Sequence, residues 1–240
     1  MAINQIRLPN GESFKIEEWL HWPLFSTIEG AAGVGVNLRA FSYVVGQRVP
    51  QAGAISTGAR DATEADTNHD RQSSMGHDEA FICFSMTYEH FAIEGSDNQD
   101  SVFPIPPLDN AATAPVLSGT NLRILQRLLM VEMFVGAGVS KPQASSPLSY
   151  IGQGIGAVAF GSGDALAIAN GGATALNLNY GTGGRVNPMR NQRRWQLPVV
   201  IHSDRIFYVR VHTPAGPLAG EDQDWRLRIY CDGLKRRPVA

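Results

Sequence analysis

Three short runs near the C-terminus decide the expected fold: WQLPVVI at 195–201, FYVRV at 207–211 and WRLRIYC at 225–231. Apolar side chains recur at every second position along these runs. Successive side chains of a strand point to opposite faces of a sheet, so the alternation predicts strands with one buried face. The expected core residues are Trp195, Leu197, Phe207, Val209, Trp225, Leu227 and Ile229.

Further strands are predicted upstream of these runs. FICFSMTYEHFAIE at 81–94 alternates until Glu89 and His90, where the apolar positions change parity and predict a bulge or a strand end. Shorter strands are predicted at 38–45 and 174–180. The Asn10-Gly11 pair between two short apolar runs predicts a hairpin near the N-terminus.

One helix and two insertions complete the predicted layout. LRILQRLLMVEMFV follows capping residues and has one narrow polar stripe, so a buried helix is predicted near 121–135. Residues 47–76 contain almost no large apolar side chain. Because ordering costs roughly 1–2 kcal/mol per residue, we expect other subunits to order this loop. The prediction is one all-β domain over 1–240, a jelly-roll β-sandwich with a buried helix and loop insertions at about 47–76 and 136–172.

Composition excludes several classes of protein. The chain has 240 residues, of which 43% are hydrophobic and 18% charged, which is typical of a folded domain and unlike a disordered chain. No stretch approaches the roughly 18 uncharged apolar residues of a membrane span. The first residues lack a secretory signal, so we expect no export. Two cysteines are too few for a disulfide scaffold or a zinc finger.

Charge is unevenly distributed along the chain. Seventeen of the 20 basic residues are Arg, the cation that protein interfaces prefer, although genomic base composition is an equally good explanation. Residues 1–180 carry a net charge of -8, whereas 181–240 carry +6. Such a dipolar molecule is suited to head-to-tail association or to presenting a basic face to an anion. The net charge of -2 argues against nucleic-acid binding over the whole surface.

Catalytic motifs are absent from the sequence. The glycines at 152–156 lack the spacing of a dinucleotide site, and there is no phosphate loop, nucleophile elbow or His-Glu-x-x-His pair. Three groups of residues are candidate sites, and each has a simpler interpretation. The metal-type cluster is interpreted as a solvated loop, the cysteines as buried thiols and the aspartates as a polar turn. The groups are, in this order, His69, Asp70, His77, Asp78 and Glu79; Cys83 and Cys231; and Asp97, Asp100 and Asp109. We expect no catalytic residue, metal, cofactor or small-molecule substrate.

The C-terminal sequences NQRRWQLPVVIHSDRIFYVRVHTPAG and DWRLRIYCDGLKRRPV resemble the end of jelly-roll capsid proteins from icosahedral bacteriophages. The resemblance covers residues 187–239 and the overall order of elements. It implies a shell-forming structural protein without catalysis, held by loop exchange between subunits, in a virion assembled in the host cytoplasm. Its partners would be copies of itself and other virion proteins. The chain is short for two jelly rolls, so one roll with insertions is expected, and a major, vertex or accessory role stays open.

A candidate interface follows from the alternating strands. The apolar positions are odd, so four cationic or titratable side chains are expected on the opposite face: Arg210, His212, Arg226 and Arg228. Crowded on neighbouring strands, they would repel one another unless carboxylates of the same or an adjacent subunit lay opposite. The phosphates of an enclosed genome or of lipid headgroups are the second choice of partner, and a plain solvated face is the alternative to an interface.

Two other functions remain open. One is a metal-dependent cupin-like enzyme that uses histidines from different strands as ligands. The other is a carbohydrate-binding β-sandwich, for which Trp19, Trp22 and Tyr43 are the candidate aromatic platform, although ordinary core packing also explains them.

Overall fold

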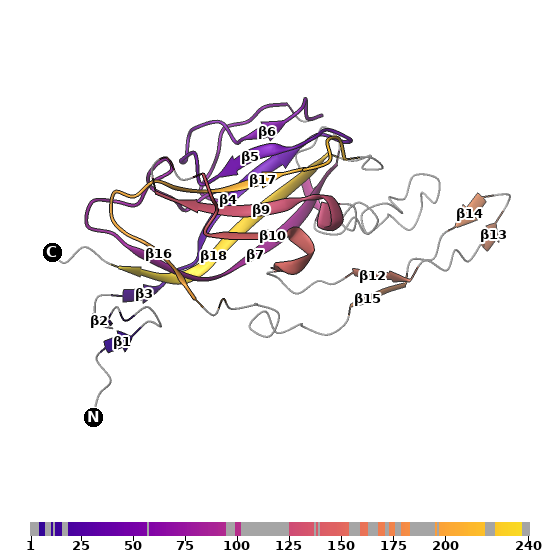
Figure 1. The fold of residues 1–240 in the computed structure, drawn as a ribbon. Coiled ribbons are helices and arrows are strands. Elements are labelled where there is room, and N and C mark those ends of the chain that lie inside the picture. The colour runs from indigo at the N-terminus through magenta and orange to yellow at the C-terminus, as the bar shows by residue number, and fades with distance from the viewer. Residues whose placement is uncertain are drawn as a thin grey trace.

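The structure is a computed structural model in which two β-sheets pack face to face as an all-β sandwich (Figure 1). It describes residues 5–7, 11, 13–15, 19–56, 58–94, 99–101, 125–136, 138, 140–153, 159–162, 168–170, 173–175, 179–182, 195, 197–218 and 224–236. Within this part of the chain, no helix has the length and apolar character needed to cross a membrane.

One sheet has four antiparallel strands in the order β10-β9-β17-β5. Their bounds are β5 Asn37–Ala40, β9 Met130–Val135, β10 Ala144–Pro147 and β17 Phe207–His212. The other sheet has eight strands, in which β18 lies between β4 and β7, and β16 pairs with the far edge of β7. Its strands are β3 Trp19–His21, β4 Leu24–Gly30, β6 Gln51–Ala52, β7 Phe81–Glu94, β8 Gln99–Ser101, β11 Gly152–Gln153, β16 Val199–Ile201 and β18 Trp225–Arg236.

The pairing order has a simple rule. Take the strands β4, β5, β7, β9, β10, β16, β17 and β18 in chain order. The first pairs with the last (β4 with β18), the second with the seventh (β5 with β17), the third with the sixth (β7 with β16) and the fourth with the fifth (β9 with β10). The pairs β18–β7 and β17–β9 complete the sheets, and all six pairings are antiparallel. As a result, β17 and β18, which follow one another in the chain, lie in different sheets.

The core lies between the two sheets and confirms most of the predicted core residues. Phe207, Val209, Trp225, Leu227 and Ile229 are all completely buried. Trp195 is half-buried against this core. The prediction for Leu197 was wrong, since 67% of its surface is exposed. The strand that was expected to bury it begins only at Val199.

Strand β7 has the predicted bounds, but its bulge is not at Glu89 and His90, where pairing with β18 is regular. The register shifts instead between Asp232 and Gly233, opposite Phe84, which stays unpaired with β18. The Phe84 carbonyl accepts a hydrogen bond of 2.8 Å from the Trp195 N–H. Gly233 is required here, because a Cβ would lie 2.0 Å from the carbonyl oxygen of Ile82.

The predicted helix near 121–135 was largely wrong. Of the described residues in this range, 125–128 are helical, and Met130–Val135 forms β9 between β10 and β17. Its burial alternates from Met130 to Met133, so the same apolar run that suits a helix also suits a strand. Backbone pairing with two neighbouring strands therefore outweighs local helix propensity.

The remaining strand predictions had mixed outcomes. The N-terminal hairpin is confirmed by β1 (Gln5–Arg7) and β2 (Ser13–Lys15), which pair antiparallel. The strand predicted at 38–45 ends earlier, at Ala40, and the next residue, Phe41, has a φ of 64°. The strand predicted at 174–180 is replaced by two strands, β14 (Ala173–Ala175) and β15 (Asn179–Thr182); residues 176–178 lie outside the described residues.

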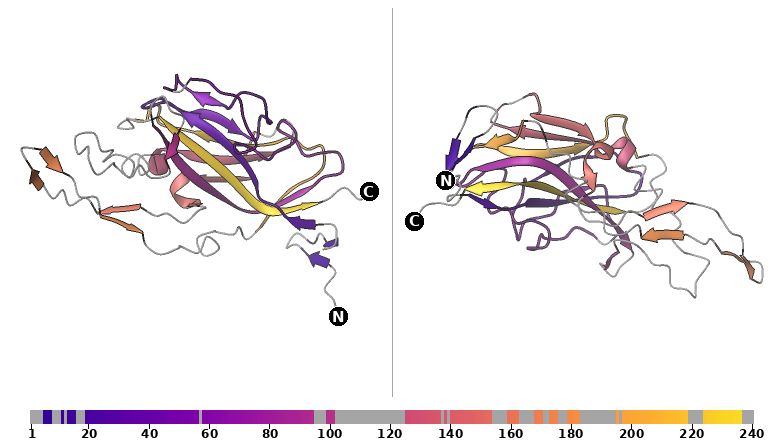
Figure 2. Two further views of the ribbon diagram at one scale, coloured as in Figure 1. Left: turned by 180° about the vertical axis from the view of Figure 1, so that it is seen from behind. Right: turned by 90° about the horizontal axis from the view of Figure 1, so that it is seen from below.

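Strands β12 (Ala159–Ser162) and β13 (Ile168–Asn170) pair with β15 and β14, respectively. These four strands, which we call the arm, form two nested antiparallel pairs within the predicted insertion at 136–172 and just after it. Among the described residues, the arm strands pair only with one another. They lie beyond one end of the sandwich, opposite the end that carries both termini (Figures 1 and 2).

The predicted insertion at 47–76 packs along the edge of β4. The Tyr43 hydroxyl, just before this segment, accepts from the Thr27 N–H at 2.9 Å and donates to the Thr27 carbonyl at 2.6 Å. Further along the same edge, the backbone N–H groups of β4 donate to carbonyl or side-chain oxygens of the segment. Contacts within the chain therefore order this segment, contrary to the expectation that other subunits are needed.

Candidate interaction surfaces

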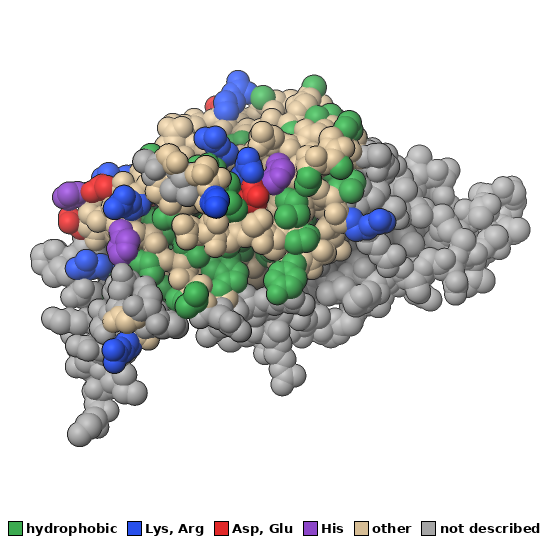
Figure 3. Space-filling view, in the orientation of Figure 1, with side chains coloured by type: hydrophobic (Ala, Val, Ile, Leu, Met, Phe, Trp, Pro, Cys, Tyr) green, Lys and Arg blue, Asp and Glu red, His purple; other side chains and the backbone are tan. Residues whose placement is uncertain are grey.

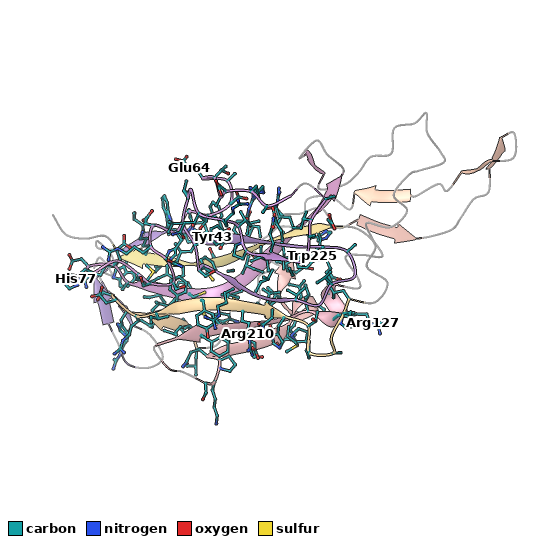
Figure 4. All side chains as sticks on the ribbon, turned by 90° about the horizontal axis from the view of Figure 1, so that it is seen from above. Tyr43, Glu64, His77, Arg127, Arg210 and Trp225 are labelled. Atoms are coloured by element: carbon teal, nitrogen blue, oxygen red, sulfur yellow. The ribbon has the colours of Figure 1, made fainter. Side chains whose placement is uncertain are left out.

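The four predicted interface residues do not share a face. Arg210 and His212 lie on β17 in the four-stranded sheet, whereas Arg226 and Arg228 lie on β18 in the eight-stranded sheet. Each pair points away from the core, so the two pairs belong to opposite outer sides of the sandwich. Figure 4 shows Arg210 on the outer side of one sheet. The expected crowding was wrong because the connection at 213–224 carries the chain from one sheet to the other.

On the eight-stranded sheet, Arg226 is buried in an ion-pair network. Its Nε donates to Oε1 of Glu29 at 2.7 Å, and Nε of Arg60 donates to the same oxygen at 2.8 Å. Nε2 of Gln51 donates to the other carboxylate oxygen at 2.9 Å. Glu29 is fully buried, and Arg226 is 5% exposed. Arg226 is therefore inaccessible to another subunit.

Asp66 extends this network into the 47–76 segment. Two guanidinium nitrogens of Arg60 bind its two carboxylate oxygens at 2.7 and 2.6 Å, and the backbone N–H of Thr63 donates at 2.9 Å. Burial alone raises the pKa of Asp66, but the bonds from Arg60 and Thr63 outweigh it and lower the pKa to about 2. The ionised carboxylate thus fastens the segment to the sheet at neutral pH.

Arg228 is also neutralised within the chain. Its guanidinium lies 3.2 Å from a carboxylate oxygen of Glu89, and the Tyr230 hydroxyl donates to the same oxygen at 2.7 Å. Glu29 and Glu89 both come from the acidic part of the chain, 1–180, so the expectation of carboxylate partners holds within one subunit. This side of the sandwich offers no unpaired cation at the predicted positions.

The four-stranded sheet presents a more open basic surface. One row crosses its strands as Ser145, Glu132, Arg210 and Arg39. Nε of Arg210 donates to Oε2 of Glu132 at 2.9 Å, and a second guanidinium nitrogen contacts the same oxygen. Nδ1 of His212 lies 3.7 Å from that oxygen, too far for a hydrogen bond. The Glu132 carboxylate is therefore the shared acidic neighbour of Arg210 and His212. Figure 3 shows this mixed basic cluster over the sheet.

Arg39 has no carboxylate partner among the described residues and is exposed. Its guanidinium carbon lies 4.5 Å from the centre of the Tyr208 ring. Tyr208 in turn stacks on Phe134, with ring centroids 5.1 Å apart and an interplanar angle of 16°. A guanidinium stacked in this way keeps its in-plane N–H groups available for a carboxylate or a phosphate. We call Arg39, Phe134, Tyr208, Arg210 and His212 the basic–aromatic face.

A second surface is a pocket of about 360 Å³ at the open side of the sandwich, beside β10 and β16. The described residues that line it are all uncharged: Met86, Gln143, Ala144, Ser145, Ser146, Tyr150, Ile151, Trp195, Leu197 and Val199. Tyr150 and Leu197 are 55% and 67% exposed. Sequence reasoning missed this site because its residues come from three separate segments. One signal was present: Asp164 is the only charged residue from 142 to 184.

The metal-type cluster does not converge. His69 is buried against the rings of Phe41 and Phe207, with centroid distances of 6.0 and 5.1 Å, and burial lowers its pKa to about 4. His77 is exposed and lies 2.7 Å from Asp204, which raises its pKa. No group of three or more His, Cys, Asp or Glu suited to a metal ion occurs within the described ranges.

The other candidates are dispersed as well. Trp19 and Tyr43 are buried and Trp22 is 44% exposed, so the three do not present a common aromatic platform. Cys83 and Cys231 are both buried, and burial beside a second thiol raises the pKa of Cys83, which suppresses its nucleophilic thiolate. Asp97, Asp109 and the glycines at 154 and 156 lie outside the described residues, and only the backbone of Asp100 is described.

No family model, curated protein or solved structure matches this chain.

Proposed function

We propose that the sandwich is a single jelly roll and that the chain is a non-catalytic shell subunit of an icosahedral bacteriophage virion. The strand order supports the first part. Pairing of first with last, second with seventh, third with sixth and fourth with fifth is the order of an antiparallel ribbon rolled into two facing sheets. A fold by itself does not specify a function, so the second part needs a separate argument.

The arm carries the argument for assembly. Among the described residues, β12 pairs only with β15 and β13 only with β14, and both pairs lie beyond one end of the sandwich (Figure 1). An isolated two-stranded hairpin is marginally stable in water, because it buries little apolar surface. The arm sequence is also nearly uncharged and rich in Ala, Gly and Leu. Such a segment becomes stable when it packs against another surface, as in a subunit assembly.

The proposed partners follow from the two surfaces. Copies of this chain and other virion proteins are the main partners. The basic–aromatic face is the surface for anions, since Arg39 lacks a carboxylate partner among the described residues and Arg210 shares Glu132 with His212. Those anions are carboxylates of a neighbouring subunit or, as the second choice, phosphates of an enclosed genome or of lipid headgroups. The proposed location is the virion.

Sedimentation velocity and electron microscopy of the purified full-length chain test this function. We expect large closed particles or discrete oligomers that grow with protein concentration. A chain that sediments as a monomer at every concentration and salt would overturn the proposal. Metal analysis and a glycan array on the same sample address the two other classes: a stoichiometric metal supports a cupin-like enzyme, and specific glycan binding supports a carbohydrate-binding sandwich.

A further inference from the structure

The arm and the uncharged pocket are adjacent in the chain. Tyr150 and Ile151 line the pocket just before β11, and the first arm strand begins at Ala159. After the arm ends at Thr182, the next described residue is Trp195, which also lines the pocket. The chain therefore leaves the sandwich at the rim of this pocket and returns to the same rim.

The chemical character of the pocket matches that of the arm. The ten described lining residues are uncharged, and two large ones, Tyr150 and Leu197, are mostly exposed. The arm lies in a stretch of 43 residues, 142–184, with Asp164 as its single charged residue. Exposed apolar area beside a pocket commonly marks a protein interaction site. An uncharged segment can enter such a site without removing a charge from water.

No described residue of the arm lines this pocket in the same subunit. Both views in Figure 2 show the arm strands beyond the end of the sandwich, and they pair only with one another among the described residues. The pocket has a volume of about 360 Å³, enough for several apolar side chains. Every further copy of the chain carries an identical arm that needs a surface to pack on.

We propose that the pocket beside β10 and β16 receives the arm of a second copy of this chain. This inference rests on the proposed function, and it names the contact that joins subunits. Because the arm of one copy enters the pocket of the next, the contact is heterologous. Such contacts close into rings when the rotation between copies permits it.

Two substitutions at the rim test the contact. Tyr150→Asp and Leu197→Asp place a charge where the arm would pack, and their high exposure leaves folding of the sandwich intact. Val45→Asp is the matched control, since Val45 is 48% exposed and does not line the pocket. The rim of the pocket would lie at the centre of the proposed contact. We therefore expect the rim variants to raise the dissociation constant of assembly by about tenfold or more. The control should assemble like the parent, and all four proteins should melt at similar temperatures.

A labelled synthetic peptide of residues 154–184 provides a second readout. It should bind the full-length parent and the Val45→Asp protein, and bind Leu197→Asp at least about tenfold more weakly. If the parent assembles and the rim variants assemble equally well, the proposed function stands and this contact is overturned. If the parent stays monomeric, the proposed function fails, and peptide binding is then the only test of the contact between arm and pocket. Peptide binding that Leu197→Asp abolishes supports the contact, whereas absent or unchanged binding overturns it.

Discussion

The two outer faces of the sandwich carry similar sequences and have different environments. Strand β17 presents Arg210 and His212 at alternate positions, and β18 presents Arg226 and Arg228 in the same manner. Arg226 is buried and shares Glu29 with Arg60, whereas Arg210 is half-buried and its carboxylate partner Glu132 has 13% of its side chain exposed. An alternating cationic pattern therefore does not reveal whether a cation contacts solvent, a partner or its own chain.

The difference arises from what covers each face. The 47–76 segment contributes Arg60 and Asp66 to the eight-stranded sheet, which encloses the network around Glu29. No described segment provides a comparable carboxylate for Arg39 on the four-stranded sheet. A polar segment can be ordered without a large apolar surface when its charges are paired and fully hydrogen-bonded, which explains why the composition argument failed for this segment.

The largest expected effect comes from reversing one charge on each face. Arg226→Glu places a second carboxylate beside the buried Glu29, and we expect the chain not to fold, because the cost of an unpaired buried charge approaches the stability of a whole domain. Arg210→Glu, at a side chain that is 37% exposed and lies next to Glu132, should cost about 1 kcal/mol. The solubility of the two variants and their unfolding in urea, followed by tryptophan fluorescence, measure these effects. Equal stability of the two variants would contradict the assignment of Arg226 to the interior.

A milder pair of substitutions removes the carboxylates. Glu29→Gln leaves Arg226 and Arg60 without their shared partner, and we expect a loss of about 3–5 kcal/mol in the free energy of unfolding. Glu132→Gln, on the more open face, should cost about 0–1 kcal/mol. Urea titrations of both variants and the parent give the difference. If Glu132→Gln is the more damaging, the comparison between the faces is reversed.

The dependence of stability on pH tests whether the histidines in the interior of the sandwich, rather than the ion pairs on its two faces, cause unfolding in acid. Burial lowers the pKa of His69 and of His90 to about 4, below the ordinary value of 6.5. Between pH 6.5 and 4 the unfolded chain therefore binds protons that the folded chain does not bind. The free energy of unfolding thus decreases as the pH is lowered through this range. The loss is at most roughly 3 kcal/mol for each histidine.

Urea unfolding at pH 7 and pH 4.5 measures this loss, and the variants His69→Gln and His90→Gln should each show a smaller pH dependence. Asp66 keeps its charge in this range, since its pKa is about 2, so the network with Arg60 should not contribute to the loss. A parent protein with the same free energy of unfolding at both pH values would show that these histidines are not buried.

The smallest expected effect on stability concerns Arg39. Because it is exposed and has no carboxylate partner among the described residues, Arg39→Gln should lose only its stacking on Tyr208, about 0.5 kcal/mol of the free energy of unfolding. If phosphates bind the basic–aromatic face, the variant should reduce the salt slope of single-stranded oligonucleotide binding by about 1. Arg48→Gln is the control, since Arg48 pairs with Asp61 on the 47–76 segment. Identical salt slopes for the two variants would exclude Arg39 as a phosphate contact.

Local alternation predicted β7, β17 and β18, whereas the equally clear run at 195–201 forms a strand only from Val199. The prediction at 81–94 coincides with β7, and the core positions of β17 and β18 are correct, because the side-chain period of a strand is a property of neighbouring residues. Prediction failed where one local pattern fits two structures. Residues 130–135 are apolar enough for a buried helix, and pairing with β10 and β17 made them a strand. The pocket also escaped prediction, since it joins three separate segments.

By itself, the sequence determined which side of each strand faces the core, and hence that Arg210, His212, Arg226 and Arg228 point outward. The tertiary structure alone decided what each of them meets. Arg210 and Glu132 are 78 positions apart in the chain, and Arg226 and Glu29 are 197 positions apart. Alternation depends on adjacent residues, whereas the burial and pairing of an outward side chain depend on which distant segment the fold brings over it.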